Sequence, residues 1–106
     1  MGDWIDVCAE GEIGSGEYRL IELADTLVAV YCVDGEHYAI EDVCTHDGAE
    51  LAGGPLCGFE LECPRHGARF DLRTGRALCP PAYVDTHVFP LRVEDGRVQF
   101  RDDRDD

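Results

Sequence analysis

The sequence has little that would let it bind nucleic acid or cross a membrane. Its 106 residues include 23 acidic side chains against nine basic ones, and the formal net charge is -14. Because phosphate binding depends on clustered cationic groups, nucleic acid is excluded as an expected partner. The longest apolar run, residues 27–33, is far shorter than the roughly 20 residues that span a bilayer. Since no export signal is recognisable either, we expect a cytoplasmic protein without a membrane partner.

Long stretches with a 3.6-residue apolar period are also missing, which argues against a helical domain. Short alternating or β-branched segments occur instead, at residues 17–23, 26–33 and 37–40. Asp34-Gly35 and Asp95-Gly96 separate strand-like segments, and this residue pair favours type I′ hairpin turns, in which both central residues have positive φ. The chain is too short for two ordinary domains. We therefore expect a single all-β domain built from antiparallel strands.

Regular structure is scarce between residues 43 and 84, where glycine and proline are frequent. A loop-rich stretch of about 40 residues is unusual in a compact domain unless something other than a hydrophobic core organises it. We expect a metal-binding subdomain over about 43–84, inserted into a base formed by residues 1–42 and 85–101. The acidic tail, residues 102–106, has no apolar side chain to bury and is expected to be mobile.

Four potential metal ligands stand in two tight pairs. Cys44-Thr45-His46 is followed by sixteen residues and then by Cys63-Pro64-Arg65-His66. Two irons bridged by two sulfides each need two protein ligands, so these four side chains suffice for one 2Fe-2S cluster. A structural zinc site is the alternative from another class, because two cysteines and two histidines also form a tetrahedral set. Zinc motifs, however, more often pair like with like.

The double motif resembles the Rieske family, in particular the ferredoxin components of bacterial aromatic-ring-hydroxylating dioxygenase systems. The resemblance continues through residues 67–71, Thr74-Gly75 and Pro80-Pro81-Ala82 to a closing hairpin. It implies the Rieske, or ISP-domain-like, fold, in which antiparallel sheets form a base and a loop-rich subdomain binds the cluster. The loop with Pro80 and Pro81 would cover that cluster.

Ligand roles follow from the same resemblance. Cys44 and Cys63 would bind one iron of a single Rieske 2Fe-2S cluster, and His46 and His66 would bind the other. The protein would then be a soluble, monomeric one-electron carrier between a flavoprotein ferredoxin reductase and a terminal oxygenase. Two further members of the family stay open as alternatives, namely the small subunit of a nitrite reductase and a Rieske protein of iron-sulfur assembly.

Catalysis by this chain itself is not expected. The catalytic subunits of oxygenases need a second, mononuclear iron site of two histidines and a carboxylate. Outside the two motifs only His37 and His87 remain. Both lie in strand-like segments, where we expect surface or partly buried side chains without a metal.

The residues around the motifs predict a low reduction potential. Respiratory relatives carry a disulfide between the cluster loops, and its positions correspond to Ala49 and Arg65 here. They also place serine and tyrosine hydroxyls near the cluster, where this chain has Ala68 and Phe70. Since hydrogen bonds to the sulfurs raise the potential, we expect a value toward the low end of the Rieske range of about -150 to +300 mV.

The four cysteines outside the motifs need no metal. Cys8 and Cys32 lie in strand-like segments and are expected to be buried thiols. Cys57 and Cys79 belong to the expected cluster-binding subdomain, which leaves a disulfide or a redox role open for them. A reducing cytoplasm favours free thiols at both positions.

Overall fold

The computed structural model describes residues 3–43, 50–64, 67–80 and 84–104, and this part of the chain contains strands and no helix. The strands are β1 (Trp4–Ala9), β2 (Tyr18–Glu22), β3 (Leu27–Val33), β4 (Glu36–Glu41), β5 (Leu56–Cys57), β6 (Glu60–Glu62), β7 (Arg69–Asp71), β8 (Ala77–Cys79), β9 (Val88–Phe89), β10 (Leu91–Glu94) and β11 (Arg97–Arg101). The all-β prediction is confirmed.

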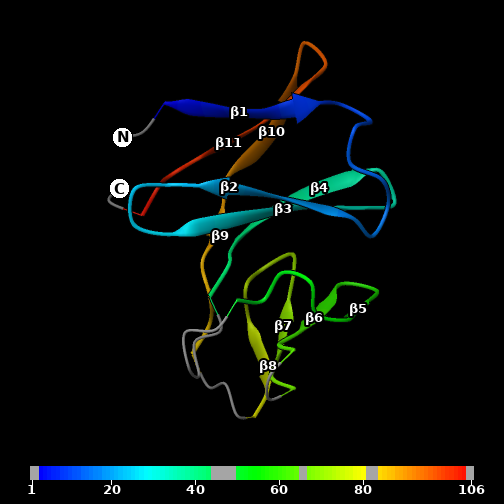
Figure 1. The fold of residues 1–106 in the computed structure, drawn as a ribbon, viewed down its shortest axis with the longest axis vertical. Coiled ribbons are helices and arrows are strands. Elements are labelled where there is room, and N and C mark those ends of the chain that lie inside the picture. Colours follow the sequence, from blue (N-terminus) through cyan, green and yellow to red (C-terminus); the bar gives the residue numbers. More distant parts are fainter. Residues whose placement is uncertain (1–2, 44–49, 65–66, 81–83, 105–106) are drawn as a thin grey trace.

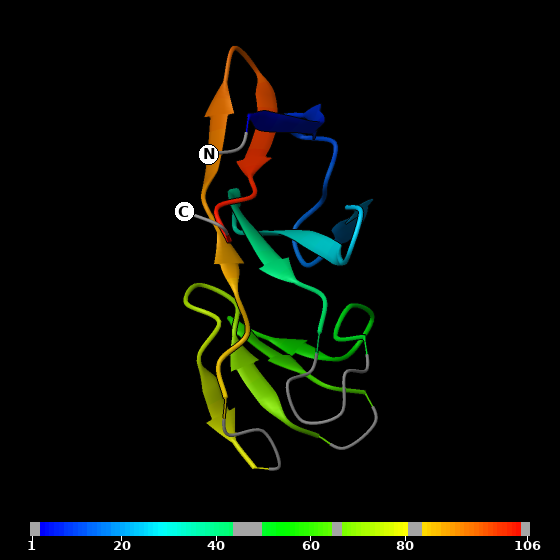
Figure 2. The same cartoon turned by 90° about the vertical axis from the view of Figure 1, so that its left-hand side faces the viewer.

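Three antiparallel sheets follow one another along the long axis of the molecule (Figures 1 and 2). The first has the order β1-β11-β10, the second β2-β3-β4-β9 and the third β5-β6-β7-β8. The third sheet lies at the lower end in Figure 1, and the chain enters it after β4 and returns to the second sheet at β9. This sheet was not anticipated from the sequence, since its strands are only two or three residues long.

The two hairpin turns of the base have the predicted geometry. Asp34 and Gly35, between β3 and β4, have φ values of 51° and 82°. Asp95 and Gly96, between β10 and β11, have φ values of 52° and 74°. Two successive positive φ values give a turn whose twist matches that of the flanking strands. These turns fix the register of the β3–β4 and β10–β11 hairpins.

Strand β3 is buried on both faces and joins the two halves of the core. Val28, Val30 and Cys32 belong to a cluster that fills the space between the first and second sheets, together with Phe89 and Phe100. Side chains alternate across a strand, so the residues between them point the other way.

The residues on the opposite face of β3 belong to the second cluster. Ala29, Tyr31 and Val33 pack there with Leu51 and Phe70. This cluster lies between the second and third sheets, which explains why the apolar run at 27–33 is continuous rather than alternating. The predicted burial of Cys8 and Cys32 is confirmed, since they are 2% and 5% exposed.

Residues 102–104 of the acidic tail lie against the base, and the expected mobility of the tail stays a prediction. The Arg104 guanidinium donates to Asp102 Oδ1 and Oδ2 and to Asp25 Oδ1, each at 2.8 Å, and lies 3.5 Å from Glu41 Oε2. Asp103 Oδ1 lies 2.6 Å from His87 Nε2. The tail is therefore held by ion pairs to distant parts of the base, which its lack of apolar residues did not reveal.

Candidate metal centre

Of the four predicted ligands, Cys63 is described by the structure, whereas Cys44, His46 and His66 lie outside the described residues. Cys63 follows β6 directly and is completely buried. Its backbone N–H donates to the Ala68 carbonyl at 2.7 Å, and its carbonyl accepts from the Gly67 N–H at 3.1 Å. Gly67 has a φ of +76°, a conformation that suits glycine. The second ligand pair thus begins in a tight loop between β6 and β7.

Asp42 connects the two described stretches that flank the predicted first ligand pair. Its Oδ1 accepts hydrogen bonds from the backbone N–H groups of Leu51 and Ala52, both at 2.7 Å. Asp42 is 3% exposed. Its carboxylate therefore joins the end of β4 to residues 51–52, on the far side of Cys44 and His46 in the sequence.

The described residues that follow the predicted first ligand pair meet the end of β6 at Gly54. A Cβ atom at this position would collide with the Glu62 carbonyl oxygen and would come within 3.1 Å of Pro64 Cδ. The Glu62 N–H donates to the Pro55 carbonyl at 2.9 Å in the same region. Only a residue without a side chain allows this approach. Residues 51–55 consequently lie directly against the strand end that leads into Cys63.

After the loop predicted to cover the cluster, the chain is held by hydrogen bonds where it returns to the base. Asp85 Oδ1 accepts from the Ala77 N–H at 2.9 Å, and the Thr86 N–H donates to the Gly75 carbonyl at 2.8 Å. A Cβ at Gly75 would collide with the Thr86 carbonyl oxygen, so the two backbones are in close contact. Pro80 is within the described residues and Pro81 is outside them.

Tyr31 is a buried hydroxyl group that the sequence gave no reason to single out. It is 1% exposed and shares the second hydrophobic cluster with Cys63. Burial raises the pKa of its phenol to about 12, assisted by the charges of Tyr18 and Asp42 and opposed by the nearby Gly53 amide. Ala68 and Phe70 are fully buried in the same cluster, and neither side chain can donate a hydrogen bond.

The chemistry of Cys63 fits a metal ligand. Cysteine is a common iron ligand, and Cys63 is buried next to a tight loop. Among the described cysteines none forms a disulfide. Cys57 and Cys79 lie on β5 and β8, the opposite edges of the third sheet. Three strand spacings separate them by about 14 Å, too far for a disulfide between them.

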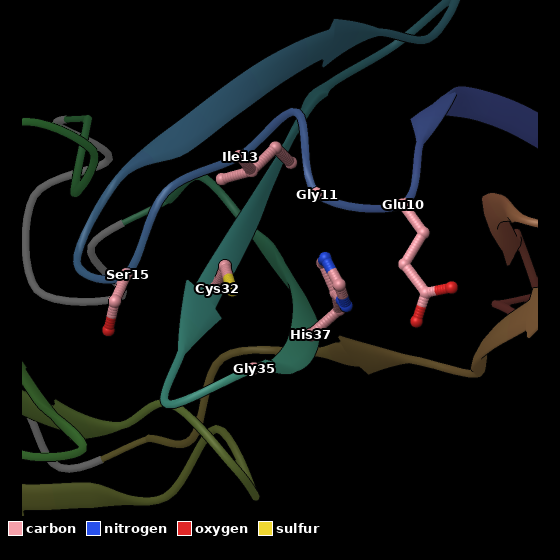
Figure 3. Close-up of a pocket in the computed structure, with 7 residues that line it drawn as sticks. All are labelled: Glu10, Gly11, Ile13, Ser15, Cys32, Gly35 and His37. Atoms are coloured by element: carbon pink, nitrogen blue, oxygen red, sulfur yellow. The ribbon is translucent and has the colours of Figure 1, made fainter.

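The cavity in Figure 3 lies in the base and is lined by residues of the β1–β2 connection and the β3–β4 hairpin. Its volume is about 290 Å³, and Cys32 and His37 face it from paired positions on adjacent strands. Within the described ranges no group of three histidine, cysteine or acidic side chains is placed to hold a metal. His37 on β4 and His87, which directly precedes β9, are both partly buried, so the expected strand position is confirmed for His37 only.

None of the described residues forms a helix that is long and apolar enough to cross a membrane.

Comparison with known proteins connects this arrangement to one family. The model of the Rieske 2Fe-2S domain matches residues 3–90. The ferredoxin component of the naphthalene 1,2-dioxygenase system of Pseudomonas aeruginosa is 42% identical over 97 residues, which cover 92% of this chain and 93% of the relative.

Solved structures agree with the sequence match. A chain in the complex of reduced oxygenase and oxidised ferredoxin of carbazole 1,9a-dioxygenase superposes with a TM-score of 0.88 at 37% identity, covering 92% of each chain. A putative NADH-dependent nitrite reductase small subunit from Mycobacterium tuberculosis superposes with a TM-score of 0.81 at 26% identity, covering 96% of each chain.

Proposed function

Because the chain belongs to the Rieske 2Fe-2S domain family, we propose that it is the electron carrier of a dioxygenase system and that Cys44, His46, Cys63 and His66 bind its cluster. Its cofactor is a Rieske 2Fe-2S cluster, and its relatives are ferredoxin components rather than catalytic subunits. When bound, this cluster supplies a one-electron redox couple. The chain's own residues bind it, shield it and present it to partners.

One observation carries the ligand assignment. Cys63 is fully buried, free of a disulfide, and placed where the segment after Gly54 meets the strand end before Pro64. This is the contact expected if the first and second ligand pairs grip one cluster from two sides. In this assignment Cys44 and Cys63 bind one iron, and His46 and His66 bind its neighbour.

The cofactor is tested by the spectra of the purified protein. Reddish-brown colour and an electron paramagnetic resonance signal of the reduced protein with a low average g value are expected, since nitrogen ligation lowers that average relative to all-cysteine clusters. A colourless protein that contains one zinc per chain would overturn the assignment. Iron and acid-labile sulfide should each amount to two per chain.

The proposed partners are a flavoprotein ferredoxin reductase and a terminal oxygenase, each bound transiently. Val84 is 65% exposed, the highest value among the large apolar side chains of the described residues, and it follows the loop predicted to cover the cluster, where a partner would dock. Redox partners commonly form small, short-lived interfaces. The protein would act as a monomer in the cytoplasm, and the five described cysteines are free thiols, which suits that reducing compartment.

The partner assignment needs a transfer experiment. The reduced protein is mixed with an aromatic-ring dioxygenase and, separately, with the large subunit of a nitrite reductase, and its reoxidation is followed by absorbance. We expect fast reoxidation by the oxygenase. Preference for the nitrite reductase would favour the second candidate, which the superposition on the Mycobacterium tuberculosis protein keeps in view.

A further inference from the structure

The base contains a cavity that electron transfer by the cluster does not use. It lies between the β1–β2 connection and the β3–β4 hairpin (Figure 3), and its volume is about 290 Å³. An apolar cavity of about 150 Å³ is large enough to bind benzene. The cavity in the base therefore has room for a compound with a single ring and a substituent.

The walls of this cavity are held in place by hydrogen bonds. The Gly16 N–H donates to the Cys32 carbonyl at 2.7 Å, which ties the β1–β2 connection to β3. The Asp34 N–H donates to Ser15 Oγ at 3.1 Å, which ties the same connection to the β3–β4 turn. A preformed cavity spares a ligand the cost of ordering the protein around it.

Two of the lining side chains offer apolar surface. Ile13 and Cys32 are each 5% exposed, and both belong to the hydrophobic cluster between the first and second sheets. A free cysteine packs as a small hydrophobic side chain. This part of the cavity favours an apolar ring over a polar chain.

His37 contributes a polar atom that needs a partner. It is paired with Cys32 across β3 and β4, and its ring faces the cavity (Figure 3). Its Nε2 is buried and has no hydrogen-bond partner among the described residues. A buried polar atom without a partner destabilises a protein. A hydroxyl group can both donate and accept a hydrogen bond, so it suits either tautomer of the imidazole.

Charge selects against anionic ligands. Glu10 lines the same cavity, and its side chain is exposed to solvent. The whole chain has a formal net charge of -14. A carboxylate at the cavity and a negative field around the protein both repel anions. The ligand is therefore expected to be neutral.

We propose that this cavity binds a neutral phenol with a single ring. The ring would lie against Ile13 and Cys32, and the hydroxyl would form a hydrogen bond with His37 Nε2. A flat aromatic ring has few torsions to lose on binding, and an acidic phenolic hydroxyl is a strong donor. No covalent step is involved. Since every contact comes from the base, the proposal does not depend on the assignment of the cluster ligands.

The affinity is tested by calorimetric titration of the full-length, cluster-loaded protein with phenol, toluene and benzoate. We expect one phenol per chain with a dissociation constant of about 1 mM, which is typical of so small a ligand, and no binding of benzoate. His37→Leu should weaken the binding of phenol about tenfold relative to that of toluene, because it removes the polar partner and keeps an apolar wall. His87→Leu is the matched control, since His87 is also partly buried but does not line the cavity.

The location is tested by the amide resonances of the wild-type protein during the phenol titration. The signals of Gly11 and Gly35, which both line the cavity, should shift with the same dissociation constant. The proposal is overturned if phenol does not saturate the protein, if benzoate binds as well as phenol, or if the shifts lie outside the cavity. An equal phenol-to-toluene ratio in wild type and His37→Leu would overturn it too. Should His37→Leu not fold, His37→Phe provides a second apolar ring with the same expected change, and the location and the rejection of benzoate still decide in the wild type.

Discussion

The base and the region of the third sheet are built on different principles. In the base, β3 is seven residues long and pairs with β2 and β4 over most of its length. In the third sheet, β5 has two residues and the other three strands have three each. Short strands contribute few ladder bonds, so this sheet depends on the shared hydrophobic cluster and on single polar or steric contacts. Those contacts are formed by Asp42, Gly54, Gly75 and Asp85.

The base and the region of the third sheet therefore have different roles. A long-stranded base needs no cofactor to define its strand pairing, whereas the region of the third sheet contains the proposed ligands for one. Functional residues commonly lie on loops that a rigid scaffold positions. We therefore expect substitutions of the proposed ligands to abolish the cluster and substitutions in the base to leave it intact.

The largest effect is expected at the ligands themselves. Replacing Cys63 or His66 with alanine should abolish the cluster, because an iron with one protein ligand missing is no longer held. Visible absorption together with iron and sulfide analysis measures this loss. His87→Ala is the control, since His87 pairs with Asp103 in the base, and its spectrum should equal that of the wild type. A wild-type spectrum in His66→Ala would refute the ligand assignment.

Removal of the cluster should affect the two regions unequally. We expect amide hydrogen exchange of the apoprotein to lose protection in β6 and β7 by a factor of ten or more, which corresponds to about 1.4 kcal/mol at 25 °C. The amides of β3 and β4 should keep most of theirs, because their pairing does not involve the ligand segments. Equal loss in both regions would show instead that the domain unfolds as one cooperative unit.

A side chain at Gly54 should destabilise the protein by about 1–3 kcal/mol, the usual cost of overpacking. The added methyl group of Gly54→Ala would collide with the Glu62 carbonyl, which belongs to the backbone and cannot turn away. Chemical denaturation measures the change. Gly14→Ala in the base is the matched control, because its new Cβ would contact only the flexible carboxylate end of Glu17. Equal effects at both positions would argue against a tight contact at Gly54.

The turns and the central strand of the base could be predicted from the sequence because they depend on local residue preferences. Asp34-Gly35 and Asp95-Gly96 specify their turns by conformational preference alone, and the apolar run at 27–33 indicates a strand buried on both faces. The ligand candidates were visible for the same reason, because Cys-x-His and Cys-x-x-His place donors a few residues apart. Of these four candidates, only Cys63 lies within the described residues, and the assignment of all four as ligands remains a prediction.

Features that depend on distant partners could not be predicted. The strands of the third sheet are too short to show a period of two. Asp42 resembles any other acid of a highly acidic chain until its amide partners at Leu51 and Ala52 are known. The docking of the tail depends on Asp25 and Glu41, which are more than 60 residues from Arg104 in the sequence.

The smallest effect concerns this tail. The Arg104 guanidinium lowers the pKa of Asp102 from 3.8 to about 2, mainly through side-chain hydrogen bonds. A folded-state pKa below the unfolded value means that the pair stabilises the fold fully above about pH 4. That contribution, at most about 1 kcal/mol for a partly exposed pair, disappears as the pH falls toward 2. Carboxyl chemical shifts of Asp102 should titrate near 2 in the wild type and closer to 3.8 in Arg104→Gln. Identical titrations would show that Arg104 does not form the ion pair with Asp102.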